Sequence, residues 1–167
     1  MRPLTVDQTA SWYRRHMAWP VEIADSRVVL PLGRGFTAFD TPAGYVSKVL
    51  VHLKALHSDD FSVPVLSDGQ ADGRAVFLAE ADGTVLGQYQ MPYDVTFLDS
   101  AIELVLPLRA PGPAGGNRSW RVPPNPAARW LLPGPAVLAA INAAAPPSHR
   151  WRPAKRAASR PARTIIG

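Results

Sequence analysis

The central part of the chain sets the strongest constraint on the fold. Between residues 61 and 108, short apolar segments alternate with turn residues: "SVPVL", "RAVFLAEAD", "DVTFLD" and "AIELVLPL" are separated by clusters that contain Asp and Gly. Apolar segments of this length, bounded by turn residues, are typical of β-strands joined by tight turns. The middle of the chain therefore predicts a sheet.

The N-terminal segment predicts a helix followed by a hairpin. Thr5 and Gln8 have the spacing of a capping box, and an amphipathic pattern continues to Ala18. Pro20 ends this helix, and "VEIAD" and "RVVLPLG", on either side of an Asp-Ser turn, are typical of two short strands. The next apolar segment, "GFTAFD", is a third predicted strand.

Two further helices are predicted on the C-terminal side of these strands. The first lies in "AGYVSKVLVHLKALH" after Pro42, where the apolar residues fall on one helical face. The second is the Ala-rich "GPAVLAAINAAA", which Pro146 and Pro147 end. "RSWRVPP" is expected to be an edge strand. This order predicts an α+β domain in which helices cover one face of a mostly antiparallel or mixed sheet.

The basic charge is concentrated at the C-terminal end. The 167 residues contain 18 Lys and Arg and 13 Asp and Glu, and six of the basic residues but none of the acidic ones lie in residues 146–167. Residues 1–145 therefore carry 12 basic and 13 acidic residues, a formal charge of −1. We expect one folded domain over 1–145 and a disordered basic tail, rich in Pro, Ala and Arg, over 146–167.

The tail is the predicted binding site for DNA or RNA. Basic side chains bind phosphates with release of counterions, and a tryptophan among them can stack on an unpaired base. The predicted nucleic-acid-binding residues are Arg150, Trp151, Arg152, Lys155, Arg156, Arg160 and Arg163. A solvated extension without a partner is an equal alternative, because abundant Ala, Arg, Pro and Gly are typical of proteins from high-GC bacteria.

The order of segments resembles the N-terminal bifunctional DNA primase/polymerase domain of the archaeo-eukaryotic primase superfamily. The similarity covers about residues 19–138 and rests on four landmarks in order: "GRGFTAFDTP", "RAVFLAE" after a Gly-rich turn, "VTFLDSAIELVLPL", and "SWRVPPNPAARWLLP". In that family the first and third landmarks carry acidic motifs, and the second presents a histidine to the nucleotide phosphates. The resemblance implies an RRM-like palm and nucleotidyl transfer with two metal ions.

The chain departs from this family where the metal ions would be held. Carboxylates at alternating positions of a strand point the same way, but neither alternating neighbour of Asp40 is acidic. Arg74 stands near the expected position of the histidine, where it could hold a phosphate in a different way. Asp99 or Glu103 could take the third acidic position. We therefore expect a degenerate site.

Two interpretations of Asp40 follow. Its spacing from Pro42 suits the N-cap of a helix that begins with proline, and this is the favoured interpretation. The alternative is a retained ligand of a divalent ion. Accordingly no cofactor is expected, and Mg²⁺ or Mn²⁺ would bind only if the metal site is retained.

The sequence thus predicts a degenerate primase/polymerase-like domain without catalytic activity that acts as a nucleic-acid-binding or regulatory module. One alternative is a weakly active nucleotidyltransferase that uses Asp40, Asp99 and Glu103. Another is a protein-interaction scaffold, which an exposed apolar patch would indicate. The chain contains no cysteine, no recognisable signal peptide and no apolar run long enough to cross a bilayer, so we expect a cytoplasmic protein without a membrane partner.

Overall fold

The computed structural model describes residues 4–56, 61–68, 72–81, 90–100, 102–108, 118–128, 130–149, 152–153 and 164–166. The helices and helical turns are α1 (Val6–Trp12), the π-helical η1 (Tyr13–Met17), the 3-10 turn η2 (Ala43–Tyr45), α2 (Val46–Leu56), α3 (Gly134–Ala144) and the 3-10 turn η4 (Pro147–His149). The strands are β1 (Glu22–Ala24), β2 (Arg27–Pro31), β3 (Phe36–Pro42), β4 (Phe61–Ser62), β5 (Val65–Ser67), β6 (Arg74–Glu80), β7 (Gln90–Met91), β8 (Thr96–Leu98), β9 (Ile102–Leu106), β10 (Ser119–Val122), β11 (Trp130–Leu131), β12 (Arg152–Pro153) and β13 (Thr164–Ile166).

The central layer is a five-stranded sheet with the order β10-β5-β6-β3-β8, in which every neighbouring pair is antiparallel. Strands β3 and β6 pair along their whole length, from Phe36 opposite Glu80 to Pro42 opposite Arg74. The apolar run of β6 is fully buried from Ala75 to Ala79. Residues on both faces of a strand are buried only when both faces of its sheet are covered.

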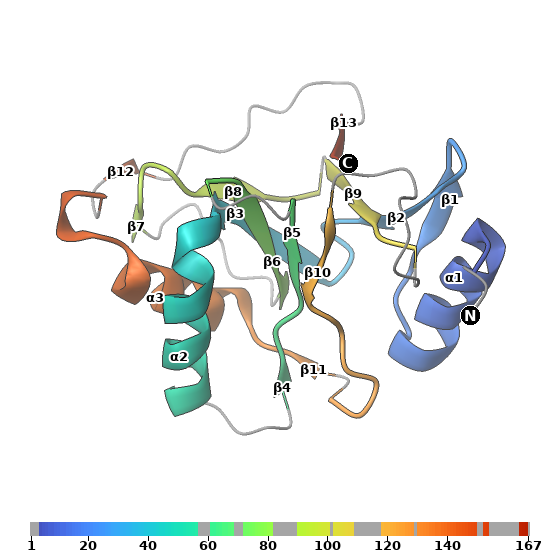
Figure 1. Ribbon diagram of the computed structural model, residues 1–167, viewed down its shortest axis with the longest axis horizontal. Helices are drawn as coiled ribbons and strands as arrows, with labels where there is room; N and C mark the ends of the chain where they lie inside the picture. The colour runs from blue at the N-terminus through green and yellow to red at the C-terminus, as the bar shows by residue number, and fades with distance from the viewer. Residues whose placement is uncertain are drawn as a thin grey trace.

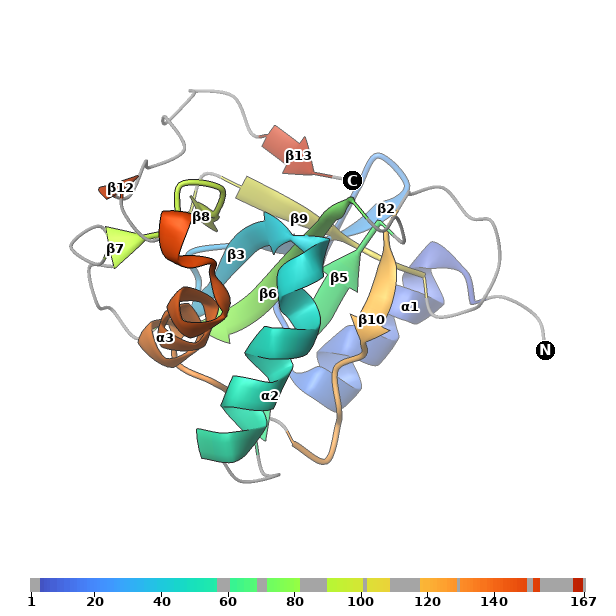
Figure 2. The same ribbon diagram turned by 60° about the vertical axis from the view of Figure 1, so that its left-hand side comes forward.

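Helices α2 and α3 cover one face of this sheet (Figure 2). Phe39 of β3 and Phe77 of β6 pack there against Val49 of α2 and Ile141 of α3, and all four side chains are fully buried. The predicted helices after Pro42 and Pro133 are confirmed, because the apolar face of each lies on the sheet.

A second sheet, with α1 beside it, covers the other face (Figure 1). Its strand order is β1-β2-β9-β13, and Leu30 of β2 and Leu104 of β9 belong to the same core as Val76 and Leu78 of β6. The predicted α+β architecture with antiparallel sheets is confirmed. The structure differs from the expected single sheet with helices on one face, because strands β1, β2 and β9 form a second sheet that covers the other face.

The first helix begins as predicted. The Thr5 hydroxyl accepts from the Gln8 backbone N–H at 3.2 Å, and the Gln8 side chain accepts from the Thr5 backbone N–H at 3.0 Å, which completes a capping box. Its last turn widens into the π-helical η1 and ends at Ala18, whose φ of 55° is left-handed.

The folded contacts continue past the expected domain boundary at residue 145. The turn η4 packs onto the domain, β12 pairs with β7, and β13 pairs in parallel with β9. The remainder of the expected disordered tail, residues 150–151, 154–163 and 167, lies outside the described residues. No helix in the described parts of the chain is both long and apolar enough to cross a membrane.

Candidate functional site

Asp40 and Arg74 are joined across the central sheet. Arg74 Nε donates to Asp40 Oδ1 at 3.1 Å, and Arg74 Nη2 donates to the Asp40 carbonyl at 2.9 Å. Arg74 Nη1 donates to the carbonyl of Asp94 at 3.0 Å. Because Asp40 lies opposite Val76, Arg74 is its diagonal neighbour on the same face of the sheet. The guanidinium thus neutralises Asp40 and satisfies two carbonyl groups.

The expectation that Asp40 caps the following helix is wrong. Asp40 lies within β3, which continues to Pro42, and the N-cap position of η2 is Pro42 without a side-chain hydrogen bond. The first N–H of that turn, on Ala43, donates instead to the Gly73 carbonyl at 2.8 Å. Pairing with β6 keeps Asp40 in the strand, so its carboxylate meets Arg74 and not the helix.

Asp40, Asp99 and Glu103 are not brought together as a metal site. Asp99 follows β8 and accepts the N–H of Ile102 at its carbonyl, at 3.0 Å, in the turn that leads to β9. Glu103 belongs to β9 in the second sheet and is buried. Within the described ranges, no group of three or more Asp, Glu or His residues could hold a metal ion.

The structure extends the Asp40–Arg74 pair into a larger polar cluster. Asp94 Oδ2 accepts from the Tyr45 hydroxyl at 2.8 Å and lies 3.1 Å from His149 Nδ1. His149 Nε2 lies 2.8 Å from the Tyr93 hydroxyl, and the two rings are in contact, with centroids 4.5 Å apart. Since Arg74 donates to the Asp94 carbonyl, the network is continuous. We call these six residues (Asp40, Tyr45, Arg74, Tyr93, Asp94 and His149) the polar cluster.

Asp94, His149 and the Tyr93 hydroxyl follow one another in the order of the carboxylate, imidazole and hydroxyl of a catalytic triad. With Nδ1–H donated to Asp94, His149 Nε2 accepts from Tyr93, as a base accepts from a nucleophile in a catalytic triad. The cation of the cluster, Arg74, is already used by Asp40 and Asp94. Within the described cluster, no other cation is available to stabilise a developing negative charge. The hydrogen bonds of the cluster instead hold four segments of the chain together.

Tyr45 is held in its neutral form. Burial, and then the hydrogen bond to the Asp94 carboxylate, raise the pKa of Tyr45 far above its ordinary value. The hydroxyl is thus a permanent donor to Asp94 at physiological pH. The second oxygen of that carboxylate, Oδ1, is buried without a hydrogen-bond partner among the described residues.

Sequence reasoning missed Tyr45, Tyr93, Asp94 and His149. They come from η2, from the turn after β7 and from η4, so no short motif contains them. The adjacent Tyr93 and Asp94 in "MPYD" were the one local signal. His149 was assigned to the disordered tail, because a Pro-rich segment before it ended the last predicted helix.

Most of the predicted nucleic-acid-binding residues lie outside the described residues: Arg150, Trp151, Lys155, Arg156, Arg160 and Arg163. Arg152 begins β12, for which only the backbone pairing is described. On the folded domain, Arg121 Nη2 lies 3.4 Å from the Ser47 hydroxyl.

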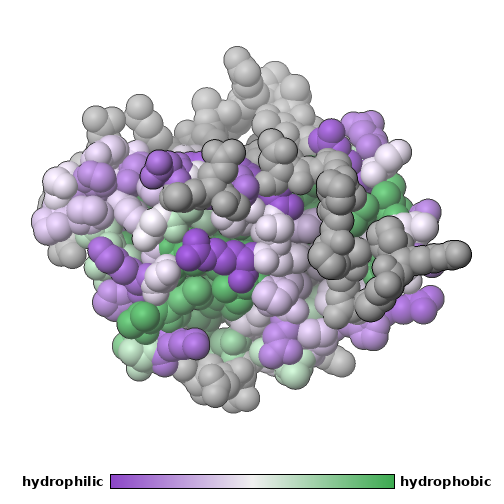
Figure 3. Space-filling model, in the orientation of Figure 1, coloured by the Kyte–Doolittle hydropathy of each residue, from purple (hydrophilic) through white to green (hydrophobic). Residues whose placement is uncertain are grey.

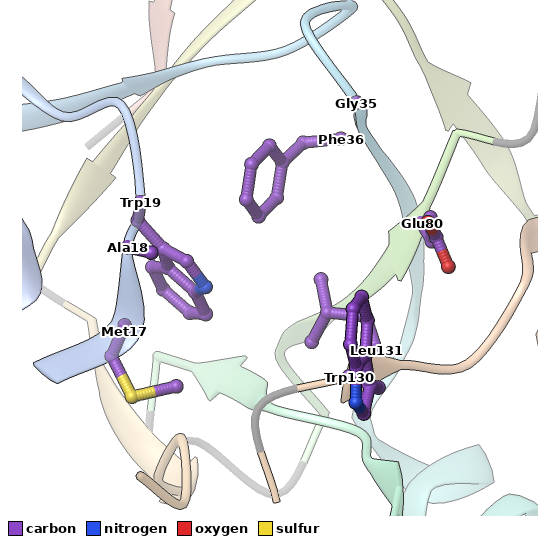
Figure 4. Close-up of a pocket in the computed structure, with 8 residues that line it drawn as sticks. All are labelled: Met17, Ala18, Trp19, Gly35, Phe36, Glu80, Trp130 and Leu131. Atoms are coloured by element: carbon purple, nitrogen blue, oxygen red, sulfur yellow. The ribbon is translucent and has the colours of Figure 1, made fainter.

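A second candidate site lies at the other end of β3 and β6. It is an apolar pocket of about 380 Å³, which we call the aromatic pocket, and its lining residues are Met17, Ala18, Trp19, Gly35, Phe36, Glu80, Trp130 and Leu131. Figure 4 shows Trp19 and Trp130 on opposite sides of the space, with the Phe36 ring between them at one edge. Trp130 is 69% exposed, an unusual exposure for a side chain of this size.

No family model, no curated protein and no solved structure matches the chain.

Proposed function

We propose that this chain is a catalytically inactive domain of the primase/polymerase type that acts as a nucleic-acid-binding or regulatory module. The observation that carries the loss of catalysis is the contact between the Arg74 guanidinium and the Asp40 carboxylate, 3.1 Å apart. Asp40 is the residue that the family resemblance assigns to the first acidic motif, and here a protein cation is already bound to it.

Arg74, beside Asp40, disfavours the binding of a metal ion there for an electrostatic reason. Two-metal nucleotidyl transfer needs several carboxylates that converge on the ions. To bind Mg²⁺ through Oδ1, Asp40 would have to give up Arg74, and the guanidinium would then lose its carboxylate partner while it still donates to the carbonyls of Asp40 and Asp94. A divalent ion beside that guanidinium would also be repelled by it.

The nucleic-acid part of the proposal rests on the distribution of charge. Residues 1–145 are close to neutral, and the six basic residues follow His149. His149 is held by Asp94, Tyr45 and Tyr93, so the basic part of the tail follows a fixed point on the domain, next to the Asp40–Arg74 pair. A basic segment tethered in this way binds phosphates without reading bases.

Primer extension tests the loss of catalysis. We expect no incorporation of nucleotides by the purified chain with Mg²⁺ or Mn²⁺, whether a primer is supplied or not. Robust incorporation that Asp40→Asn abolishes would instead establish the weakly active nucleotidyltransferase.

Deletion of residues 150–167 tests the binding site, because it removes the six basic residues and keeps His149. It also removes β12 and β13, so circular dichroism should show that the truncated chain keeps its fold. We expect most of the affinity for DNA to be lost. For the full chain, the slope of log affinity against log salt should be no steeper than about −5, since each of at most six contacts contributes about −0.9. A truncated chain that binds as tightly as the full chain would move the site to the folded domain, with Arg118 and Arg121 the first residues to replace.

A protein-interaction module is the second candidate, and a specific observation favours it. Val51 and Leu56 of α2 are 67% and 70% exposed. Figure 3 shows hydrophobic residues gathered over the lower part of α2. Exposed apolar patches mark interaction surfaces. If this surface mediates self-association, light scattering should show oligomers of the wild type that dissociate in Val51→Lys/Leu56→Lys.

A further inference from the structure

The aromatic pocket combines an open aromatic wall with one isolated charge. Trp19 is buried and meets Phe36 edge to face, with ring centroids 5.6 Å apart. Trp130 stands across the space and is mostly exposed, so one of its ring faces is open to an incoming group (Figure 4). Glu80, at the end of β6, is also exposed, and no described residue forms an ion pair or hydrogen bond with its carboxylate.

Three backbone groups around this pocket are already satisfied. The carbonyl of Gly35 accepts from the Ala81 N–H at 3.1 Å, and that of Phe36 accepts from the Gly33 N–H at 2.7 Å. The N–H of Glu80 donates to the Leu132 carbonyl at 2.9 Å. The Glu80 carboxylate is therefore the charged group available to a ligand among the described lining residues.

The space beside Gly35 is open. Its φ of +82° is in the left-handed region, and a Cβ placed there would meet no atom within 4 Å. Ala18, on the opposite side, also has a positive φ, at 55°. A non-glycine residue in this conformation is uncommon, and here it is the C-cap that ends η1.

We propose that the aromatic pocket binds a quaternary ammonium group, a trimethylammonium head on an alkyl stem. The exposed ring of Trp130 and the partly buried ring of Phe36 attract a cation through their π-electrons, and tryptophan does so best. Glu80 supplies the opposite charge. A neutral apolar ligand would remove Glu80 from water without any compensating partner, which is costly.

The absence of N–H groups on the ligand is what selects it from other organic cations. An arginine side chain would bring five N–H donors to a pocket in which one carboxylate is available to accept them. A quaternary ammonium has none to satisfy and presents methyl groups to the rings, Met17 and Leu131. The volume of about 380 Å³ lies within the range of small-ligand pockets. This binding activity goes beyond the proposed function and does not depend on it.

Calorimetric titration of the full chain with choline, at constant ionic strength, tests the proposal. The neutral isostere 3,3-dimethylbutan-1-ol has the same shape without the charge, and we expect it to bind at least about tenfold more weakly. Trp130→Ala should weaken choline binding by roughly tenfold, because it removes the exposed ring. Glu80→Gln should weaken choline binding and leave binding of the alcohol unchanged.

Glu22→Gln is the matched control, because Glu22 is an exposed carboxylate outside the pocket that pairs with Arg34 at 3.4 Å. It should leave choline binding unchanged. A parallel titration with the amide of trimethyllysine distinguishes the two sources of this head group: tighter binding than choline assigns a modified side chain of a protein, and weaker binding assigns a free small molecule. The proposal is overturned if the wild type binds neither cation saturably, or if the neutral alcohol binds as tightly as choline.

Discussion

Strands β3 and β6 run side by side from the aromatic pocket to the polar cluster, and the two ends differ in how their polar groups are satisfied. At the Asp40 end, Arg74 makes three hydrogen bonds, to Asp40 and Asp94. At the Phe36 end, Glu80 lies in register opposite Phe36 and has no such partner among the described residues.

This difference distinguishes polar groups that stabilise the fold from polar groups that are available to bind a ligand. A charged group whose partners are all within the chain contributes to the fold and leaves little for a second molecule. An exposed carboxylate beside an exposed tryptophan contributes little to the fold. The Asp40 end of β3 and β6, which carries the predicted acidic motif, thus contributes more to the stability of the fold. The Phe36 end is more accessible to a ligand.

The largest effect on stability is expected from Arg74→Met, which removes all three side-chain hydrogen bonds of Arg74 at the Asp40 end of the sheet. Asp40, with its side chain 20% exposed, would lose its partner, and two carbonyls would lose their donors. We expect urea denaturation to show a loss of about 2–3 kcal/mol in the free energy of unfolding. Adding Asp40→Asn should recover part of it, because the unpaired charge is then removed.

Arg121→Met is the control for that change, since Arg121 makes one long contact at the surface, 3.4 Å from Ser47. It should alter the free energy of unfolding by less than about 0.5 kcal/mol. Equal free energies of unfolding for Arg74→Met and Arg121→Met would contradict the claim that the Asp40 end of the sheet stabilises the fold.

Tyr45→Phe should have the next largest effect. It removes the donor at 2.8 Å from Asp94 at a buried position, and we expect a loss of about 1–2 kcal/mol in the free energy of unfolding. Tyr93→Phe should cost less, because Tyr93 is 49% exposed and water can replace its contact. The reverse order in urea denaturation would show that Tyr93, and not Tyr45, organises the cluster.

Alkaline pH should destabilise the polar cluster through Tyr45. Its pKa is raised in the folded state, so the stabilisation is complete below the ordinary tyrosine pKa of about 10 and is lost as pH rises above it. There the unfolded chain releases the proton and the folded chain retains it, at a cost of up to about 1.4 kcal/mol per pH unit. Between pH 9 and 11, the free energy of unfolding should therefore fall more steeply for the wild type than for Tyr45→Phe. Parallel curves would contradict this origin.

Trp130→Ala should have the smallest effect on stability. Its side chain is mostly exposed, so we expect a change within about 0.5 kcal/mol in the free energy of unfolding. A loss above about 1 kcal/mol would show that Trp130 supports the fold and would remove the contrast between the two ends.

Local sequence signals predicted the elements well where the contacts that form them are local. Thr5 and Gln8 close the capping box within one turn, and Asp25 and Ser26 take the positive φ values that a tight hairpin needs. The unbroken apolar run of β6 indicated a buried strand. It did not reveal that the second cover of this strand is another sheet, because burial on two faces has the same pattern whatever element covers it.

The polar cluster could not be predicted from local patterns. Asp40 and its spacing to Pro42 suit a helix cap equally well, and only the register of β3 with β6 turns its carboxylate to Arg74. Tyr45 meets Asp94 and His149 from positions 49 and 104 residues apart in the chain. Contacts of this range depend on the assembled fold and leave no fixed spacing in the sequence.

The second sheet has a consequence for the synthesis of the protein. Strand β2 is made early, yet its partner β9 leaves the ribosome only after β3, β5, β6 and β8 have been made. Until then the β1–β2 hairpin has an unpaired edge, and Val28 and Leu30, fully buried in the finished domain, lack their cover. Pairing across such a separation is slow, and an open apolar edge can pair with another chain. Nascent chains that stall before residue 102 should therefore be the ones that most need a chaperone.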